Sequence, residues 1–266
     1  MHVSFSDVVD EIVIPGGKVA SAKLEEWRND HRYAREVVPF VTSFSQDFMF
    51  VATRAEFDTV AAIIEADENQ HALKGVSRAD NIPLTKNLNS SFAFIHLFHR
   101  YVQQKRRIPT WLEWREWLRT EAASMFAIPV SRTIRFDRMD KAQKTAVKKG
   151  LTWRLGLAYY SCMRELDVML RLRDLYGLNV RYHVLADALY RVDFWLGTKT
   201  VCLFVSNDEM KAAQTGRKPR PGQFLTSPPF SHYEAVLETQ HTYGVLHPAT
   251  DKAVEKIARF LRGAHP

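Results

Sequence analysis

The chain has 266 residues, of which 46% are hydrophobic and 12% aromatic, so we expect a folded protein and exclude disorder of the whole chain. This length suits one large core, or a core with a smaller appended domain. The formal charge of +7 suggests an anionic partner, although net charge alone accounts only for non-specific attraction.

Nothing in the sequence predicts a membrane protein or a cysteine-based site. No run approaches the roughly 18 to 20 apolar residues of a membrane span, and MHVSFSDVVDE at the start lacks a basic stretch followed by an apolar one. We therefore expect a soluble, cytoplasmic protein. Cys162 and Cys202 lack a CxxC partner and a histidine at ligand spacing, so both are predicted to be core residues.

Residues 1–130 are predicted to form a mainly helical module. DEIVIPGG predicts a short strand ended by a Gly-Gly turn, AKLEEWRNDHRYAREV an amphipathic helix, and VVPFVTSFSQDFMFVA extended segments. Thr53 with Glu56 forms a capping-box pattern before a helix that we expect to close at Gly75. FAFIHLFHRYVQQKRR predicts another helix.

A tryptophan-rich helix is predicted to follow, with Thr110 and Glu113 as its capping box. Trp111, Trp114 and Trp117 recur every three residues along it. Such side chains can stack on nucleobases, but large aromatics at helical spacing are more typical of a core. We therefore expect them in the core of the helical module.

A strongly basic stretch occupies residues 131–154, where only Asp137 and Asp140 oppose the cations. The cations recur at steps of three and four residues, so on one helix they would form a ridge able to follow a phosphate backbone. The alternative is a solvated helix face. The basic residues are Arg132, Arg135, Arg138, Lys141, Lys144, Lys148, Lys149 and Arg154.

Residues 131–266 are predicted to form an α/β domain. One long helix should run to Gly177, with Glu165 beside its apolar stripe. NVRYHVLADALYRVDFWLG and KTVCLFVSN predict two or three strands, the last two joined by a turn at residues 197–199. After a Pro- and Gly-rich loop we expect a possible helix, a short strand YGVLHP, and a helix that begins at Thr250 and closes at Gly263.

This order of elements, with an acid on the first helix and Asp193 on a strand, resembles the core of the PD-(D/E)xK nuclease superfamily. The resemblance covers residues 151–266. It implies a restriction-endonuclease-like mixed sheet flanked by helices, hence an α+β or α/β fold. It also implies divalent-metal hydrolysis of phosphodiesters, with Glu165 and Asp193 as catalytic residues and as ligands of Mg²⁺, a cation that prefers oxygen ligands.

The third motif of the superfamily, Glu-x-Lys on the next strand, is where the sequence departs. Cys202 and Phe204 occupy those positions. Glu209 and Lys211 form a literal Glu-x-Lys just past the predicted strand and could complete the catalytic set, and Lys199 could supply the positive charge instead. The alternatives are a cross-strand charge pair on a solvent-exposed sheet face for Asp193, and for Glu165 a charge turned to water or to a partner elsewhere.

A second basic feature lies in the loop GRKPRPGQF, which carries Arg217, Lys218 and Arg220. Its prolines lower the ordering cost of presenting the charges to a sugar-phosphate backbone, although it could equally be a surface connection. Together these features predict a nucleic-acid-binding protein with DNA or RNA as partner, acting as a metal-dependent nuclease if its site is complete. The alternatives are a non-catalytic nucleic-acid-binding or assembly protein that keeps the fold, and a module that binds an acidic protein.

Overall fold

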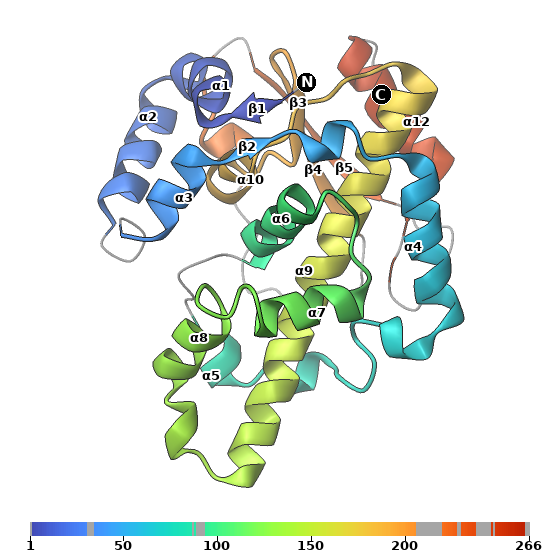
Figure 1. Cartoon of the computed structure of the whole chain (residues 1–266). Helices are drawn as coiled ribbons and strands as arrows, with labels where there is room; N and C mark the ends of the chain where they lie inside the picture. The colour runs from blue at the N-terminus through green and yellow to red at the C-terminus, as the bar shows by residue number, and fades with distance from the viewer. Residues whose placement is uncertain are drawn as a thin grey trace. The chain divides into compact units, whose positions relative to one another are not determined.

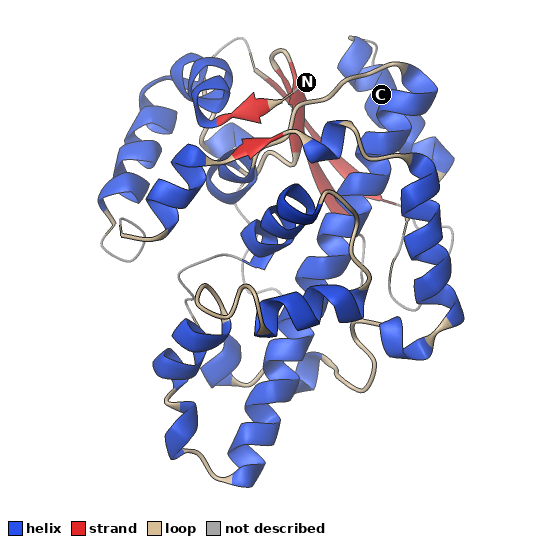
Figure 2. Cartoon of the chain, in the orientation of Figure 1, coloured by secondary structure: helices blue, strands red, loops and turns tan. Residues whose placement is uncertain are grey.

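The computed structural model describes residues 2–30, 35–86, 88, 94–205, 220–227, 230–237, 246 and 248–263 (Figure 1, Figure 2). Helices dominate, beside a two-stranded and a three-stranded sheet, so the chain is an α+β protein. No helix in these ranges is both long and apolar enough to cross a membrane.

The chain divides into two compact units. The first consists of the described residues within Met1–Val51, Glu165–Gln240 and Pro248–Pro266, and the second of those within Ala52–Arg164 and His241–His247. Contacts thus group the first fifty residues with the sheet, an arrangement different from the division expected after residue 130.

The three-stranded sheet of the first unit has the order β3-β4-β5. β3 (Phe194–Leu196) and β4 (Lys199–Val205) form the predicted antiparallel hairpin, with Gly197 at a φ of 57° in its turn. β5 (Ser231–Leu237) runs parallel to β4. The possible helix expected after the loop is wrong here, because the backbone of residues 231–237 pairs with β4 along its whole length. The predicted strand YGVLHP lies mostly outside the described residues.

The N-terminus is helical where a strand was expected. β1 (Val3–Ser4) leads into α1 (Phe5–Val8), a π-helical segment (Val9–Val13) and α2 (Ile14–Asn29), which is kinked at Gly17. Asp7 and Glu11 are four residues apart, so helical winding brings both carboxylates to one face. Arg181 binds them there, at 2.7 Å and 2.8 Å respectively. This tertiary contact favours helix over the strand that DEIVIPGG predicts.

Residues 37–51 are also mostly helical, contrary to the predicted extended segments. They form α3 (Val37–Ser43), the two-residue strand β2 (Ser45–Gln46), which pairs with β1, and a 3₁₀ turn (Phe48–Phe50). Val37 and Val41, one helical turn apart, are both buried. Packing of that face outweighs the weak β preference of valine and phenylalanine.

The predicted strand near residue 184 is a helix as well, α10 (Val184–Tyr190). His183 begins it, because its Nδ1 accepts the Leu185 N–H at 3.1 Å. Arg191, at a φ of 61°, ends it. Only an isolated bridge between Arg181 and Trp195 remains of the expected strand.

The first unit also contains the part of α9 (Lys141–Tyr176) from Glu165 onward, and α12 (Asp251–Arg262). α9 ends at Gly177 as predicted, and its expected apolar stripe is buried. α12 has the predicted cap, with Thr250 accepting the Ala253 N–H at 3.2 Å. Arg171 of α9 joins the two helices by donating to the carbonyl of Ala249 at 2.6 Å and binding Asp251.

The second unit is helical. α4 (Arg54–Ala66) begins at Thr53 as predicted but ends before the expected Gly75. The Glu56 carboxylate, expected in a capping box, accepts the Ile108 N–H at 2.9 Å. The remaining elements are 3₁₀ turns at Glu68–Gln70, Arg78–Asp80 and Phe136–Arg138, α5 (Pro83–Lys86), α6 (Phe94–Lys105), α7 (Trp111–Arg119), α8 (Ala127–Ile134) and the first part of α9.

The tryptophans of α7 lie in the core, as predicted. Trp111, Trp114 and Trp117 are 1%, 0% and 3% exposed. The ring of Tyr159 packs against Trp111 and Trp114 with centroids 5.6 Å and 5.9 Å away, and its hydroxyl donates to the carbonyl of Pro109. Stacking of these tryptophans on nucleobases is therefore excluded in this structure.

Candidate functional site

In the first unit, Asp193 lies in a bend immediately before β3, and not on the strand where it was expected. The antiparallel register begins with Phe194 opposite Val201, so Asp193 lies beside β4. The Asp193 N–H donates to the Val201 carbonyl at 2.9 Å, and its carboxylate accepts the Leu203 N–H. The parallel register then pairs Cys202 with Glu234 on β5. Cys202 therefore has Glu234 beside it on β5, and Asp193 lies on the β3 side of the same strand.

Two more carboxylates reach the same thiol from helices. Burial raises the pKa of Cys202 far above its ordinary value, and the charges of Asp193, Asp187, Glu165 and Glu234 raise it further, in that order. Four acids from α9, α10, β5 and the residue preceding β3 thus lie within electrostatic range of one sulfur. We call Cys202 and these four residues the acidic cluster.

The predicted acids Glu165 and Asp193 are both buried, at 4% and 7% exposure. Neither is turned to water, so the solvated alternatives considered for them are wrong. The other two acids are half-buried, and Glu234 accepts from Arg220 Nε at 2.7 Å. Sequence reasoning missed Asp187 and Glu234, because they join the cluster through a helix and a parallel strand that were not predicted.

The third motif of the superfamily is not present on β4. The positions of the third motif hold the Cys202 thiol and the Phe204 ring, and Mg²⁺ prefers oxygen ligands. Among the described residues, no three or more acidic, histidine or cysteine side chains gather closely enough to hold a metal ion. Glu209 and Lys211 lie outside the described residues.

Lys199, the alternative source of positive charge, lies at the start of β4. It is three positions from Cys202, so the two side chains leave opposite faces of the strand. Its Nζ donates to the Leu261 carbonyl at 3.1 Å, at the C-terminal end of α12. That contact suits the negative end of a helix dipole and ties the strand to the helix.

The basic stretch belongs to the second unit and is not one continuous ridge. Arg132 lies on α8, Arg135 adopts a left-handed φ of 54° that ends α8, and Arg138 lies in the following 3₁₀ turn. Only Lys141, Lys144 and Lys148 share a face of α9, with Lys149 beside them. The predicted single ridge is therefore wrong, because the chain turns between α8 and α9 (Figure 1).

Two members of the basic stretch have structural partners. Lys149 lies 3.7 Å from the Asp80 carboxylate. Arg154 is half-buried, donates to the carbonyls of Thr85 and Leu88, and covers the Phe94 ring. Burial lowers the pKa of Arg154 from its ordinary value. Arg154 therefore serves the fold of the second unit.

Six cations remain, and we call them the cationic segment. Across the part of the chain that the structure describes, none of them forms an ion pair. The ammonium groups of Lys144 and Lys148 each lie 5.8 Å from the centre of the Phe136 ring. The six residues are Arg132, Arg135, Arg138, Lys141, Lys144 and Lys148.

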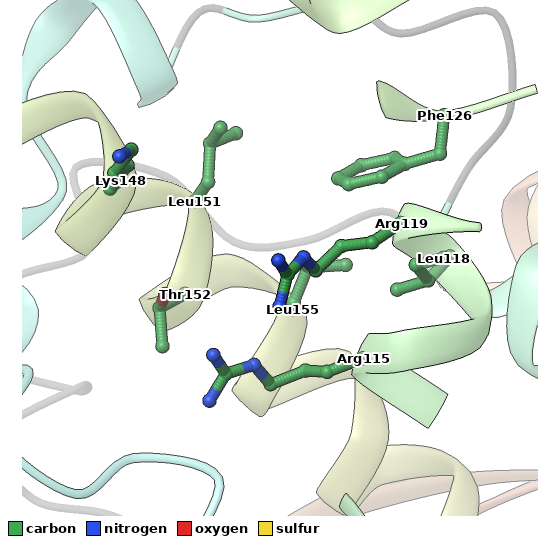
Figure 3. Close-up of a pocket in the computed structure, with 8 residues that line it drawn as sticks. All are labelled: Arg115, Leu118, Arg119, Phe126, Lys148, Leu151, Thr152 and Leu155. Atoms are coloured by element: carbon green, nitrogen blue, oxygen red, sulfur yellow. The ribbon is translucent and has the colours of Figure 1, made fainter. Parts of the chain in front are cut away.

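A pocket of about 460 Å³ lies beside the cationic segment, between α7 and α9 of the same unit (Figure 3). Lys148 is one of its lining residues, and Arg115 and Arg119 supply two more cations. The rest of the lining is Leu118, Phe126, Leu151, Thr152 and Leu155. Sequence reasoning missed both arginines. Their four-residue spacing, which puts two like charges on one helix face, was an available signal.

The second basic loop is only partly described. Arg217 and Lys218 lie outside the described residues. Arg220 binds Glu234 of the acidic cluster, so its charge is balanced within the protein.

No protein-family model, curated protein or solved structure matches this chain. Its function has to be inferred from the side chains described above.

Proposed function

We propose that the chain binds DNA or RNA through the cationic segment. The observation that carries this proposal is a set of six cations with no ion pair among the described residues. Lys141, Lys144 and Lys148 lie at three- and four-residue spacing on α9, where like charges repel one another and destabilise the helix. A bound polyanion removes that repulsion and releases counterions.

The spacing of the lysines on α9 suits a phosphate backbone. Lys141, Lys144 and Lys148 span seven residues, or about 10 Å along the helix axis. One strand of B-form DNA carries a phosphate about every 3.4 Å, so this length matches about three phosphates. Elsewhere many surface cations are neutralised on their own helix, as Arg259 is by Glu255.

We further propose that the first unit is a nuclease-like scaffold. From α9 the chain continues through α10, the antiparallel hairpin, the parallel strand β5 and α12, which keeps part of the element order that suggested the PD-(D/E)xK resemblance. Glu165 lies on the expected helix, whereas Asp193 lies just before the expected strand, and both raise the pKa of Cys202. These observations support a restriction-endonuclease-like core.

The chain is proposed to bind nucleic acid without metal-dependent cleavage. The thiol and the phenyl ring at the third motif are poor partners for Mg²⁺, and the Asp193 carboxylate already accepts a backbone N–H. The second candidate is Mg²⁺-dependent phosphodiester hydrolysis. It is favoured by the burial of both Glu165 and Asp193 and by their effect on the pKa of Cys202, and Glu209 with Lys211 would have to complete that site.

Binding can be tested by fluorescence anisotropy with single- and double-stranded DNA and RNA. The double variant Arg138→Gln/Lys141→Gln removes two exposed cations of the cationic segment. The matched control, Lys18→Gln/Lys252→Gln, removes two exposed lysines from the first unit. We expect the first variant to bind several-fold more weakly than the control. Equal affinity of both variants would contradict the proposal.

Cleavage is tested with the same substrates in Mg²⁺, in Mn²⁺ and in EDTA. The proposal predicts intact substrate in all three. Metal-dependent products that disappear in both Glu165→Gln and Asp193→Asn would establish the second candidate instead. These variants keep an oxygen acceptor at each position, so the backbone contact of Asp193 can survive.

A further inference from the structure

The pocket between α7 and α9 has the size and the composition of a site for a small organic anion. Its volume of about 460 Å³ falls in the range usual for small-molecule sites. Arg115, Arg119 and Lys148 contribute three positive charges, and none of the eight lining residues is acidic. An apolar ligand would leave those cations without a partner.

The cations are available to a ligand. Arg115 lies over the Trp111 ring at 5.6 Å and has no ion pair with any described residue. Arg119 has one carboxylate neighbour, Glu116, at 3.4 Å, and both side chains are more than half exposed, so this pair is weak. Figure 3 shows both arginine side chains extending from α7 toward Thr152 and Leu155 of α9.

The apolar part of the pocket lining makes inorganic phosphate alone a poor match for the pocket. Leu151, which is half-buried, and the small exposed parts of Leu155 and Phe126, 7% and 8%, form an apolar surface, and the Phe126 ring lies across the pocket from Leu151 (Figure 3). Inorganic phosphate would leave this surface in contact with water. A ligand that carries both a phosphate and a planar ring satisfies both parts of the lining, because aromatic side chains bind bases by stacking.

Lys148 links the pocket to the cationic segment, since it belongs to both. From there Lys144 and Lys141 continue along the same helix face. A single strand whose end enters the pocket can therefore run along these lysines. A phosphomonoester at that end carries nearly two negative charges against one for an internal phosphodiester, and arginines bind such a group bidentately.

We propose that this pocket binds the phosphorylated terminal nucleotide of a single strand. The inference rests on the proposed nucleic-acid binding and adds an end preference to it. The cationic segment then provides affinity that does not depend on the chemistry of the strand end, and the pocket provides the preference for a terminal phosphate.

The test compares oligonucleotides of one sequence that carry a 5′-phosphate, a 3′-phosphate or hydroxyls at both ends. The intact chain should bind one phosphorylated form about tenfold more tightly than the hydroxyl form, as expected for an added charge-assisted contact. Arg115→Gln/Arg119→Gln should lose this preference. Arg138→Gln/Lys141→Gln should weaken binding of all three forms but keep the preference for the phosphorylated end.

A second pocket variant separates charge from shape. Leu151→Trp fills the cavity and leaves every cation in place, so it should bind hydroxyl-ended strands normally and lose the end preference. Circular dichroism checks that each variant is folded. Salt-sensitive binding with no end preference in the intact chain would overturn the inference and leave the proposed function standing. Absence of any oligonucleotide binding would overturn both, and a preference that survives in Leu151→Trp would overturn the pocket's role.

Discussion

At the scale of single residues, His183 is the clearest titratable group with a structural role. Its Nδ1 accepts the Leu185 N–H, so the ring proton is on Nε2, which donates to the Phe44 carbonyl at 3.2 Å. Burial lowers the pKa of His183 to about 4, although the Phe44 hydrogen bond and the charge of Asp7 oppose the shift. The imidazole therefore stays neutral in the folded chain at neutral pH.

This lowered pKa makes stability depend on pH in a definite direction. In the unfolded chain His183 takes up a proton near its ordinary pKa of about 6.5, whereas in the folded chain it does so only near 4. The contribution of the neutral His183 to the free energy of unfolding is complete above about pH 6.5 and is lost as the pH falls toward 4. Urea unfolding should give a free energy lower by about 2 kcal/mol at pH 5 than at pH 7.5 from this residue. His183→Asn keeps a capping acceptor and should lose this part of the pH dependence. An unchanged pH dependence in the variant would contradict its assignment to His183.

Cys202 is the other residue with a testable environment. Burial and four nearby carboxylates raise its pKa, so almost no thiolate forms at ordinary pH. In a Cys162→Ala variant, which leaves one thiol, we expect no reaction with a disulfide reagent at pH 8 in the folded state and one equivalent in urea. Rapid modification of the folded variant would mean that the thiol is exposed or ionised, against the proposed acidic cluster.

At the scale of elements, α9 depends on two glycines that let another segment of its unit approach closely. A Cβ on Gly156 would lie 2.8 Å from the Ala72 carbonyl oxygen and 2.5 Å from Leu73 Cδ2, and Gly150 is equally crowded by Asp80 and Thr85. The glycines therefore serve packing, although glycine lowers helix propensity.

The Gly156→Ala substitution sets these two effects against each other. Helix propensity alone predicts stabilisation by about 1 kcal/mol. Because the added methyl group would overlap the Ala72 carbonyl, we expect net destabilisation by about 1–3 kcal/mol, measured as a lower free energy of unfolding in urea. A more stable variant would show that the 72–85 segment moves aside at little cost.

Elements with explicit end signals were predictable from the sequence. Thr53, Thr110 and Thr250 each accept the N–H three residues on, and the helices they begin are α4, α7 and α12. The structure of short Val- and Ile-rich runs was not predictable, because the same residues suit a strand or a buried helix. Contacts with residues distant in sequence determine which of the two forms. Arg181 decides for helix at the N-terminus, and the His183 cap does so for α10.

At the scale of the whole molecule, the acidic cluster and the cationic segment lie in different units. The acidic cluster belongs to the first unit, and the cationic segment and the pocket belong to the second. Each of these sites can therefore be altered without removing a residue from the other.

The candidate sites were predictable only in part. Glu165 and Asp193 could be named as candidate site residues because the sequence predicted the helix and the hairpin. Glu234 could not be predicted, because its position beside Cys202 depends on the register of β5, a parallel strand that is distant in sequence. Arg115 and Arg119 were missed for a similar reason. Their pocket exists only once α7 packs beside α9.

The most direct test of the central claim is the dependence of oligonucleotide affinity on salt. If all six residues of the cationic segment contact phosphates of a single strand, the logarithm of the binding constant should fall with the logarithm of salt concentration with a slope of about −4. Arg138→Gln/Lys141→Gln should reduce that slope by about 1.4, and Lys18→Gln/Lys252→Gln should leave it unchanged. An affinity that does not vary with salt, or equal slopes for all three proteins, would contradict nucleic-acid binding by the cationic segment.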